Sequence, residues 1–552
     1  MPNSHNYLFI SDLHLGAGRD LATGRTALQE DFLHDDAFAR FLVHYAHKQA
    51  EGKAIHGPSS GHYSTKPWKL VINGDLFEFM QITSLIGPGP FTRKEKRYGP
   101  GTRSDQSVLK LQIISEGHEL FFQALAWFLA HEDYELIILK GNHDLELFWP
   151  EVQQQFCKLV ADSYDNWKEY AGIGCSGDSP LPADLILANK LNEDSMNVQF
   201  PPSFCYEKDV FYAEHGGQYD NSSLLGSWVP CYENPTLPNG TPEPSDLIRL
   251  PIGSLFMRYI FNKAELYHPF AENMKPELRY LIWLFKNWPK GALRILFEYM
   301  IIGGIFLTGK KFNDLWHNFW GTERPPKVDK GQEGCSNPEM SEGFCTEFPA
   351  MQREVAKNLN KKAKKAILWV ALSLWSRVIS VIFWLVSLHY LMFISRLIWN
   401  FKLIDTEHLW LTLIFVVLAT ATWILAIYLF DCADDVLETP FLREAAQKIN
   451  DLLAKDSNGP GKVPYYIFGH DHQPFLQKLN SGNEDNGERP WYINTGYWAP
   501  EFDKDNPFRK MYKLTYFCLM PGSPDFNKTP IVLEWLPEAS RPKVAVISEE
   551  KP

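Results

Sequence analysis

Hydrophobic and polar positions divide the first part of the chain into short apolar runs and longer amphipathic segments. The runs YLFIS, KLVIN and ELIILK have the length of β-strands. The segments 30–50 and 107–131 carry apolar side chains at helical spacing, and each is followed by one of the later runs. This strand–helix alternation over residues 1–145 predicts a layered α/β domain.

The same alternation returns in the last part of the chain. A helix is predicted over residues 435–455, and the strand-like runs PYYIF and WYINTGYW follow it. A further apolar run, VFYAE, precedes the middle of the chain. We therefore expect one α/β core assembled from residues 1–225 and 431–540, with a polar and mobile tail over residues 541–552.

Residues 226–430, between the two parts of the core, are predicted to form a mainly helical insertion with two apolar segments. The second segment, 409–430, has no charged side chain and is long enough to span a bilayer, for which about 20 helical residues suffice. The first segment, 366–399, contains Arg377 and Arg396 toward its ends. Long basic side chains in such positions can reach the lipid headgroups.

The short linker between the apolar segments predicts a helical hairpin. A hairpin returns the chain to the side from which it came, so both parts of the core can still meet. The basic cluster before the first segment places that side in the cytoplasm; it consists of Lys361, Lys362, Lys364 and Lys365. We therefore expect the core at the cytoplasmic face of a membrane. The alternatives are shallow insertion, or burial of the hairpin in protein or in a dimer interface.

Composition and charge narrow the class of partner. The 552 residues carry a net charge of −12, which argues against binding of nucleic acid through a general basic face. The eight cysteines include no CxxC pair, so free thiols in a reducing compartment are expected. One local basic loop is either solvated or a site for an anionic headgroup; it contains Arg93, Lys94, Lys96, Arg97 and Arg103.

Five short polar motifs carry the candidate chemistry, and each follows one of the apolar runs. They are Asp12-Leu13-His14, Gly74-Asp75, Gly141-Asn142-His143-Asp144, Glu214-His215-Gly216 and Gly469-His470-Asp471-His472. Side chains at the carboxyl ends of several strands can converge on one edge of a sheet. Asp, His and Asn supply the oxygen and nitrogen atoms that divalent cations bind. One such residue alone would be a helix cap or a core histidine, but five strand ends together indicate a metal site.

In order and spacing, the five motifs resemble those of the calcineurin-like metallophosphoesterases. The resemblance covers residues 8–16, 70–80, 137–146, 210–220 and 466–474. It implies a two-sheet sandwich flanked by helices, and two divalent metal ions, with Mn²⁺ favoured over Fe and Zn²⁺. The implied ligands are Asp12, His14 and His472 for one metal, and Asn142, His215 and His470 for the other, with Asp75 bridging the two.

The resemblance also implies a mechanism. A water shared by the two cations would lose its proton near neutral pH, and the hydroxide would attack phosphorus. His143 would contact the phosphate or protonate the leaving oxygen, and Asp144 would orient its imidazole. Asp471, between two ligand histidines, is expected to support the site without binding metal.

The sequence indicates the identity of the substrate less clearly than it indicates the metal site. ISDLHLG, NGDLFEF and GNHDLELFW resemble the bacterial branch that includes UDP-2,3-diacylglucosamine hydrolase, which acts on a lipid-tailed nucleotide pyrophosphate. This chain differs in having His143 where that enzyme has Arg, and it is much longer. The leading expectation is a phosphodiester or pyrophosphate substrate that is lipid-linked. The alternatives are a membrane-anchored phosphatase or cyclic-nucleotide phosphodiesterase with a soluble substrate, and a non-catalytic binding module. The oligomeric state is not indicated.

Overall fold

The structure is a computed structural model of the chain, which divides into two compact units. The first unit consists of residues 1–280, 325–355 and 441–552, and the second of residues 281–324 and 356–440. The described residues are 5–20, 23–27, 29–50, 66–85, 91–172, 191, 196–219, 406–437, 441–455, 461–480, 490–502, 510–521 and 529–547, with single positions and short runs at 248–294 and 369–392.

The larger sheet of the first unit has seven strands in the order β14-β13-β12-β1-β2-β3-β4. Its parallel part consists of β1 (Asn6–Ile10), β2 (Trp68–Asn73), β3 (Glu135–Leu139) and β4 (Val198–Gln199). The first three predicted runs therefore form neighbouring parallel strands. A parallel pair needs a crossover connection, and the predicted helices supply it.

On the other side of β1 the sheet continues with antiparallel strands. These are β12 (Leu514–Leu519), β13 (Val532–Leu536) and β14 (Arg541–Val544). Strand β14 corrects the expectation of a mobile tail, because its main chain pairs with β13 whatever the polarity of its side chains. A separate small sheet pairs β10 (Pro500–Phe502) with β11 (Lys510–Tyr512).

The smaller sheet has five strands in the order β5-β6-β7-β9-β8. Their bounds are β5 (Cys205–Glu207), β6 (Phe211–Ala213), β7 (Tyr465–Phe468), β8 (Phe475–Lys478) and β9 (Trp491–Asn494). Strands β6, β7 and β9 run parallel, and β5 and β8 are antiparallel edges. The fourth and fifth predicted runs are thus neighbours, although the whole second unit separates them in the chain.

The longer helices of the first unit cover the two sheets. Their bounds are α1 (Asp35–Ala50), α4 (Ser104–Gly117), α5 (Glu119–Leu129), α6 (Pro150–Gly172) and α14 (Phe441–Lys455). Helix α14 packs on the smaller sheet, where the Tyr466 hydroxyl donates to Asn450 Oδ1 at 3.1 Å. The segment predicted as one helix over 107–131 forms two helices, α4 and α5.

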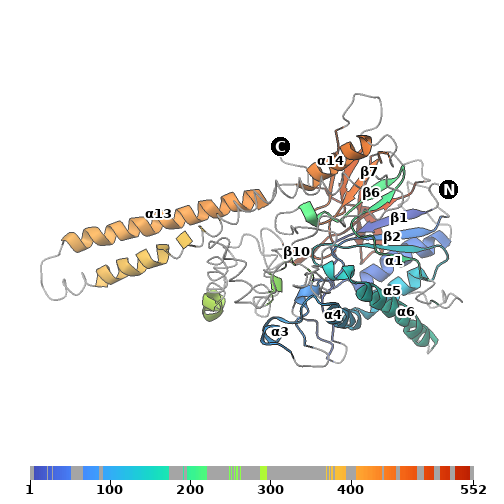
Figure 1. Ribbon diagram of the computed structural model, residues 1–552, viewed down its shortest axis with the longest axis horizontal. Helices are drawn as coiled ribbons and strands as arrows, with labels where there is room; N and C mark the ends of the chain where they lie inside the picture. The colour runs from blue at the N-terminus through green and yellow to red at the C-terminus, as the bar shows by residue number, and fades with distance from the viewer. Residues whose placement is uncertain are drawn as a thin grey trace, which may run out of the picture. The chain divides into compact units, whose positions relative to one another are not determined.

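Side chains alternate along the central strands and build a core on each face of the larger sheet. Leu8 and Ile10 of β1 pack into the core that the sheet shares with α1, α5 and α6. Tyr7 and Phe9 pack into the core between the two sheets, where Phe9 meets Phe211 edge-on at 4.9 Å. The first unit is therefore a mixed α/β assembly of helices and two sheets (Figure 1), which is compatible with the predicted sandwich.

A buried charged cluster fixes the turn between β1 and α1. The Glu30 carboxylate accepts hydrogen bonds from the main-chain N–H groups of Gly16 and Phe32. His118, at the junction of α4 and α5, lies 3.3 Å from Glu30 and 3.0 Å from Asp35. Burial opposes the charged imidazole, but the two carboxylates outweigh it and raise the pKa of His118 to about 10. This cluster coincides with the start of α1 at Asp35 and with the break between α4 and α5.

We expect His118→Gln to lower the free energy of unfolding by about 3 kcal/mol at neutral pH, because it leaves buried carboxylates without their cation. The folded pKa of about 10 exceeds the ordinary value of 6.5. The stabilisation is therefore complete below about pH 6.5 and is lost as the pH rises through about 10. Urea unfolding of the wild type and of His118→Gln at pH 6, 8 and 10 is therefore expected to show the smallest difference in free energy of unfolding at pH 10.

The control is Arg40→Gln, which breaks an exposed ion pair with Asp36 within α1. Such a pair contributes at most about 0.5 kcal/mol. Equal losses in the two variants, or a loss in His118→Gln that does not change with pH, would contradict the assignment of a charged, buried His118.

The predicted basic loop is a short helix in its first part. Helix α3 (Arg93–Tyr98) begins at Thr92, whose side chain and Glu95 form a reciprocal capping box. Lys96 is exposed, and Arg103 forms an exposed ion pair with Asp105 at 2.5 Å. The side chains of Arg93, Lys94 and Arg97 lie outside the described residues.

The second unit contains a pair of apolar helices, which we call the hairpin. It consists of helix α13 (Thr406–Leu437) and the helical residues 379–392. The two helices pack together, because the rings of Tyr390 and Phe415 stack at 5.9 Å (Figure 1). Of the helices that the structure describes, none combines the length and apolar character that crossing a bilayer requires.

The predicted membrane spans over 366–399 and 409–430 are therefore not supported. The first segment is described only in part, and α13 continues past the end of the second to Leu437. The lysine cluster at 361–365 lies outside the described residues. Of the cysteines, Cys157, Cys205 and Cys518 are free thiols.

Candidate metal centre

All five motifs lie at carboxyl ends of parallel strands, and the two sheets bring these ends together. Asp12 and Asp75 follow β1 and β2, whereas His215 and His470 follow β6 and β7. Asn73, the last residue of β2, joins the two edges. Its carbonyl oxygen lies 2.9 Å from His215 Nδ1, and its amide donates to main-chain carbonyls of the smaller sheet. The motifs of both sheets thus meet in one place.

Three groups of side chains in this place could each hold a metal ion, since their ligand atoms lie within 4.8 Å of one another. The groups are Asp12, His14 and His472; Asp75, His215 and His470; and His14, Asp75 and His143. Asn142 adjoins the second group, with its Oδ1 3.2 Å from His215 Nε2. The structure therefore brings together the predicted ligands, and Asp75 belongs to two groups, as a bridging carboxylate would.

The electrostatics of the site suit cations. Asp12 and Asp75 are buried, with exposed fractions of 0% and 1%. Burial alone would raise the pKa of Asp75, but the surrounding histidines, His215 first among them, hold it well below its usual range. Buried carboxylates that remain ionised need positive charge beside them. Either protons on the histidines or divalent cations can supply that charge, so the donor set fits metal ions.

The pKa values of His215 and His143 reflect the same negative field, whereas burial lowers the pKa of His472. Burial opposes their protonation, yet the pKa of His215 is raised to about 9, chiefly by Asp75. The pKa of His143 is raised to about 10, chiefly by Glu78 and Asp75. Metal ions would compete with these protons for the same nitrogen and oxygen atoms, so binding is coupled to proton release.

Backbone strain is concentrated at the same residues. Five of the eight non-glycine residues with positive φ in the described part of the chain are predicted ligands. They are Asp12, His14, Asp75, His470 and His472, with φ between 50° and 71°. A non-glycine residue in this region costs on the order of 1 kcal/mol, and such residues cluster at functional sites. The strain supports a functional role for the motifs.

Two motif glycines permit the close approach of the strand ends. Gly74 has a φ of +87°, and a Cβ atom there would overlap the ring of His215. A Cβ atom at Gly141 would overlap the carboxylate of Asp75. Glycine is therefore required at both positions for the ligands to converge.

Glu78 is a site residue to which the sequence analysis assigned no role. It is buried, its Oε2 contacts Nδ1 of His143, and the same oxygen lies 3.3 Å from His14 Nδ1. Asp144, expected to orient His143, instead accepts hydrogen bonds from main-chain N–H groups, including that of Leu76 at 2.7 Å. The carboxylate that contacts His143 thus comes from the second motif. The available signal was the glutamate in NGDLFEF.

For the phosphohydrolase function proposed below, we expect Glu78→Gln to reduce turnover about 10- to 100-fold with metals still able to bind, as is typical when the partner of a ligand histidine is removed. Asp144→Asn is the matched comparison, because it changes a carboxylate that touches the main chain and not the imidazole. It is expected to lower the free energy of unfolding by about 1–3 kcal/mol. Metal content, urea unfolding and turnover of both variants measure these effects. Full activity in Glu78→Gln, with a specific loss in Asp144→Asn, would restore the original assignment.

The site opens to solvent at three of its histidines, because His143, His470 and His472 are each partly exposed. The His472 side chain is 41% exposed and that of His143 is 24% exposed, whereas the side chains of His14 and His215 are nearly buried. Asp471, which is expected to support the site without binding metal, is exposed. The solvent-facing side of the site is therefore the side of His143, His470 and His472.

Three buried polar residues of the predicted insertion hold the loops around the site. Ser254 Oγ donates to the carbonyl of Asn142 at 3.3 Å, and Arg258 Nη2 donates to that of Gly99 at 3.0 Å. Asn262 Nδ2 donates to a third loop, at the Met80 carbonyl, at 2.7 Å. Their spacing of four residues places them on one helical face. No feature of the sequence singled these residues out.

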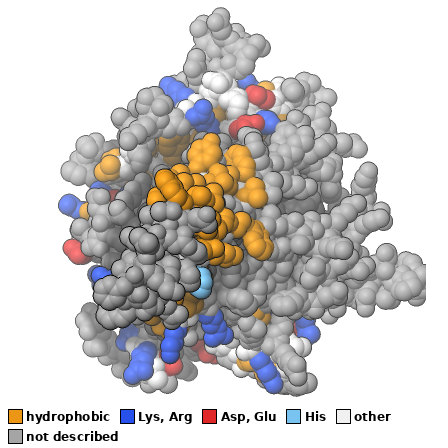
Figure 2. Space-filling view, turned by 90° about the vertical axis from the view of Figure 1, so that its left-hand side faces the viewer, with side chains coloured by type: hydrophobic (Ala, Val, Ile, Leu, Met, Phe, Trp, Pro, Cys, Tyr) orange, Lys and Arg blue, Asp and Glu red, His pale blue; other side chains and the backbone are white. Residues whose placement is uncertain are grey.

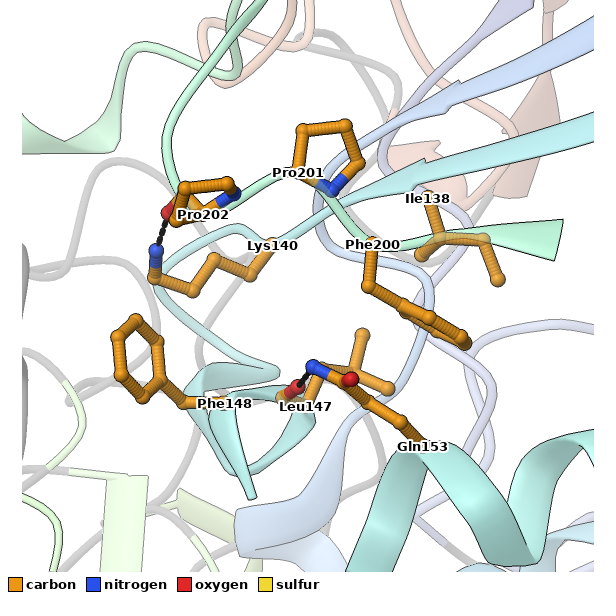
Figure 3. A pocket seen from close by; sticks show the side chains of 8 residues that line it. All are labelled: Ile138, Lys140, Leu147, Phe148, Gln153, Phe200, Pro201 and Pro202. Carbon is orange, nitrogen blue, oxygen red and sulfur yellow. Dashed lines mark hydrogen bonds between the residues drawn. The ribbon is translucent and has the colours of Figure 1, made fainter. Parts of the chain in front are cut away.

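A cavity of about 190 Å³ is built from segments that flank the third motif (Figure 3). Its lining consists of Ile138, Lys140, Leu147, Phe148, Gln153, Phe200, Pro201 and Pro202. Lys140 Nζ donates to the Pro202 carbonyl and lies 4.6 Å from the centre of the Phe148 ring. Since a cavity of about 150 Å³ admits a benzene ring in another protein, this one can take a small apolar group.

Comparisons with protein-family models, with curated proteins and with solved structures found no match for this chain. The resemblance to the metallophosphoesterases is therefore limited to the five motifs, and the function has to be argued from the site.

Proposed function

We propose that this protein is a two-metal phosphohydrolase of the calcineurin-like metallophosphoesterase type. The convergence of Asp, His and Asn donors from both sheets, with Asp75 shared between two groups, carries the proposal. Such oxygen and nitrogen donors suit Mn²⁺, Fe or Zn²⁺, and we favour Mn²⁺. When bound, the cations would generate a hydroxide nucleophile from water and neutralise the phosphoryl oxygens.

The residues of the chain would position these parts and move the protons. The proposed ligand sets are those given by the resemblance, with Asp12, His14 and His472 on one side of Asp75, and Asn142, His215 and His470 on the other. His143 would act as a proton donor to the leaving oxygen. Its Nδ1 contacts Glu78, and a carboxylate at Nδ1 fixes the ring and leaves Nε2 to donate. The partial exposure of His143 would let it reach a bound substrate.

The proposed substrate is a phosphodiester or pyrophosphate with an apolar tail. The largely apolar cavity beside the third motif supports this class, because it can receive part of such a tail. A location at the cytoplasmic face of a membrane would present such substrates at high effective concentration. No nucleic-acid partner is proposed, given the net charge of −12.

A second candidate is a phosphatase or cyclic-nucleotide phosphodiesterase that acts on soluble substrates. The exposure of His472 and His143 favours it, since a small water-soluble ester would reach the site without leaving solution. The motif Gly141-Asn142-His143-Asp144 contains the histidine that is generic for the resembled family. The cavity would then be unrelated to substrate binding.

Hydrolysis of a substrate panel by the metal-reconstituted protein tests the proposal. The panel contains a phosphomonoester, a phosphodiester, a cyclic nucleotide and a UDP-diacylglucosamine-type pyrophosphate, in detergent or liposomes. Preferential cleavage of the lipid pyrophosphate or a lipid diester supports the leading substrate class. Activity confined to soluble esters supports the second candidate. Absence of any hydrolysis with metals bound would overturn the enzymatic proposal.

A further inference from the structure

The hairpin of the second unit has an inverted arrangement of side chains. Its buried positions are small or hydroxylated: Ser380, Ser387, Thr412, Ala419 and Ala426, each at most 6% exposed. On each helix these positions are seven residues apart, so they share one face. The Ser380 hydroxyl donates to the Ala419 carbonyl at 2.7 Å, which places the two seams against each other. The helices therefore meet along a seam of small residues, beside the ring contact of Tyr390 with Phe415.

The large apolar side chains lie on the outside. Twenty of the 25 exposed large hydrophobic residues in the described part of the chain lie between Leu372 and Tyr428. Leu385, Ile424 and Tyr428 are each more than 60% exposed. Figure 2 shows hydrophobic side chains gathered in one patch on the face that it presents. Soluble monomers rarely expose a contiguous apolar surface of this kind.

Four hydroxyl groups in the described part of the hairpin, those of Ser380, Ser387, Thr420 and Thr422, donate to carbonyls within it. Thr420 and Thr422 have exposed hydroxyls that nevertheless donate to the carbonyls of Val416 and Leu418, both at 2.8 Å. Ser387 bonds back in the same way to Phe383. In a medium without water, hydroxyl groups must find their partners in the protein. Helix interfaces made of small residues, and hydroxyl groups that bond within the protein, are features of helices that pack in lipid.

We propose that the outer surface of the hairpin contacts the acyl chains of a lipid membrane. A protein partner would cover one apolar stripe of a helix, but Trp423, Ile424 and Leu425 are consecutive and all exposed, so the apolar surface of α13 extends beyond one face. A hairpin returns its ends to one side at any depth of insertion, so contact with acyl chains requires no crossing. This proposal rests on the proposed function, in which the substrate is lipid-linked and lies at a membrane. It adds that the hairpin is the surface that binds the lipid.

Flotation of the full chain with phosphatidylcholine vesicles tests the proposal. We expect the wild type to float with the vesicles and the double variant Leu385→Lys/Ile424→Lys to partition at least about tenfold less, because a charge in the acyl region is costly. The matched control is Ile531→Lys, the same change at an exposed apolar residue of the first unit, which is expected to float like the wild type. Far-UV circular dichroism and hydrolysis of a soluble ester show that the variants fold.

Two outcomes would overturn the proposal. Unchanged flotation of the double variant would place lipid binding elsewhere in the chain. A wild type that stays with the soluble fraction and is a dimer by light scattering, with a monomeric double variant, would assign the surface to a second copy of the chain. Asp75→Asn is expected to float although it is inactive, so failure of membrane binding and failure of the proposed catalysis remain distinguishable.

Discussion

Asp75→Asn is expected to lower the rate of phosphoester hydrolysis by at least about 1,000-fold. The variant would lose several kcal/mol of the stabilisation that metal ions give to the transition state, and such a loss corresponds to a rate factor of that size. Asp75 belongs to two of the three candidate metal groups and lies 3.1 Å from His215. Asparagine has the same shape but lacks the charge that would hold two cations together. It also removes the negative partner of the surrounding histidines.

The measurement is turnover together with metal content per chain, at neutral pH and in excess Mn²⁺. Asp471→Asn is the control, since Asp471 is an exposed carboxylate of the fifth motif outside the metal groups. We expect it to retain metal and to change turnover by less than about threefold, in line with the small energies of surface substitutions. Retention of both metals and full activity in Asp75→Asn would remove the basis for a bridged two-metal centre.

His143→Gln is expected to slow hydrolysis of esters with poor leaving groups by about 100- to 10,000-fold, which is the usual contribution of a general acid. Esters with an acidic phenol as leaving group need no proton in the transition state, so their hydrolysis is expected to change much less. His143 contacts Glu78, and its main-chain N–H donates to Asp75 at 2.9 Å. Glutamine keeps that main-chain bond, so the metals are expected to remain.

A leaving-group series, measured on wild type and His143→Gln with metal content in parallel, separates two roles. The geometry also places His143 in a group with His14 and Asp75 that could hold a metal. A uniform loss for all leaving groups, accompanied by loss of metal, would assign His143 to the ligand set and not to proton transfer.

Much of the candidate site was predictable from local patterns. Strand ends are visible as apolar runs that stop at polar residues. Asp12 stands directly after such a run, and Asp75 and His470 each follow a run after a single glycine. Parallel strands present these ends at one sheet edge, and the structure places them there. Element limits were less predictable. The helix break at His118 coincides with its contact with Glu30, and the start of α1 coincides with the contact between Asp35 and His118, all of which join distant parts of the chain.

The outer limits of the elements depend on pairing that no local pattern shows. Strand β14 looks like a polar tail, since its residues have few apolar side chains, yet its main chain completes the edge of the larger sheet. The hairpin illustrates the opposite case. Its apolar character is evident in the sequence, but hydropathy does not tell which residues pack together, and the seam of Ser380 and Ala419 emerged only from the structure.

The sequence by itself determined which residues could bind metal, because residue type and position after a strand are local properties. Only the tertiary structure decided which carboxylate contacts His143, since Glu78 and Asp144 both carry a carboxyl group and the fold directs only that of Glu78 to the imidazole. The positive φ angles of Asp12, His14 and His470 likewise depend on the surrounding packing. Contacts between distant segments impose them, and local sequence preference opposes them.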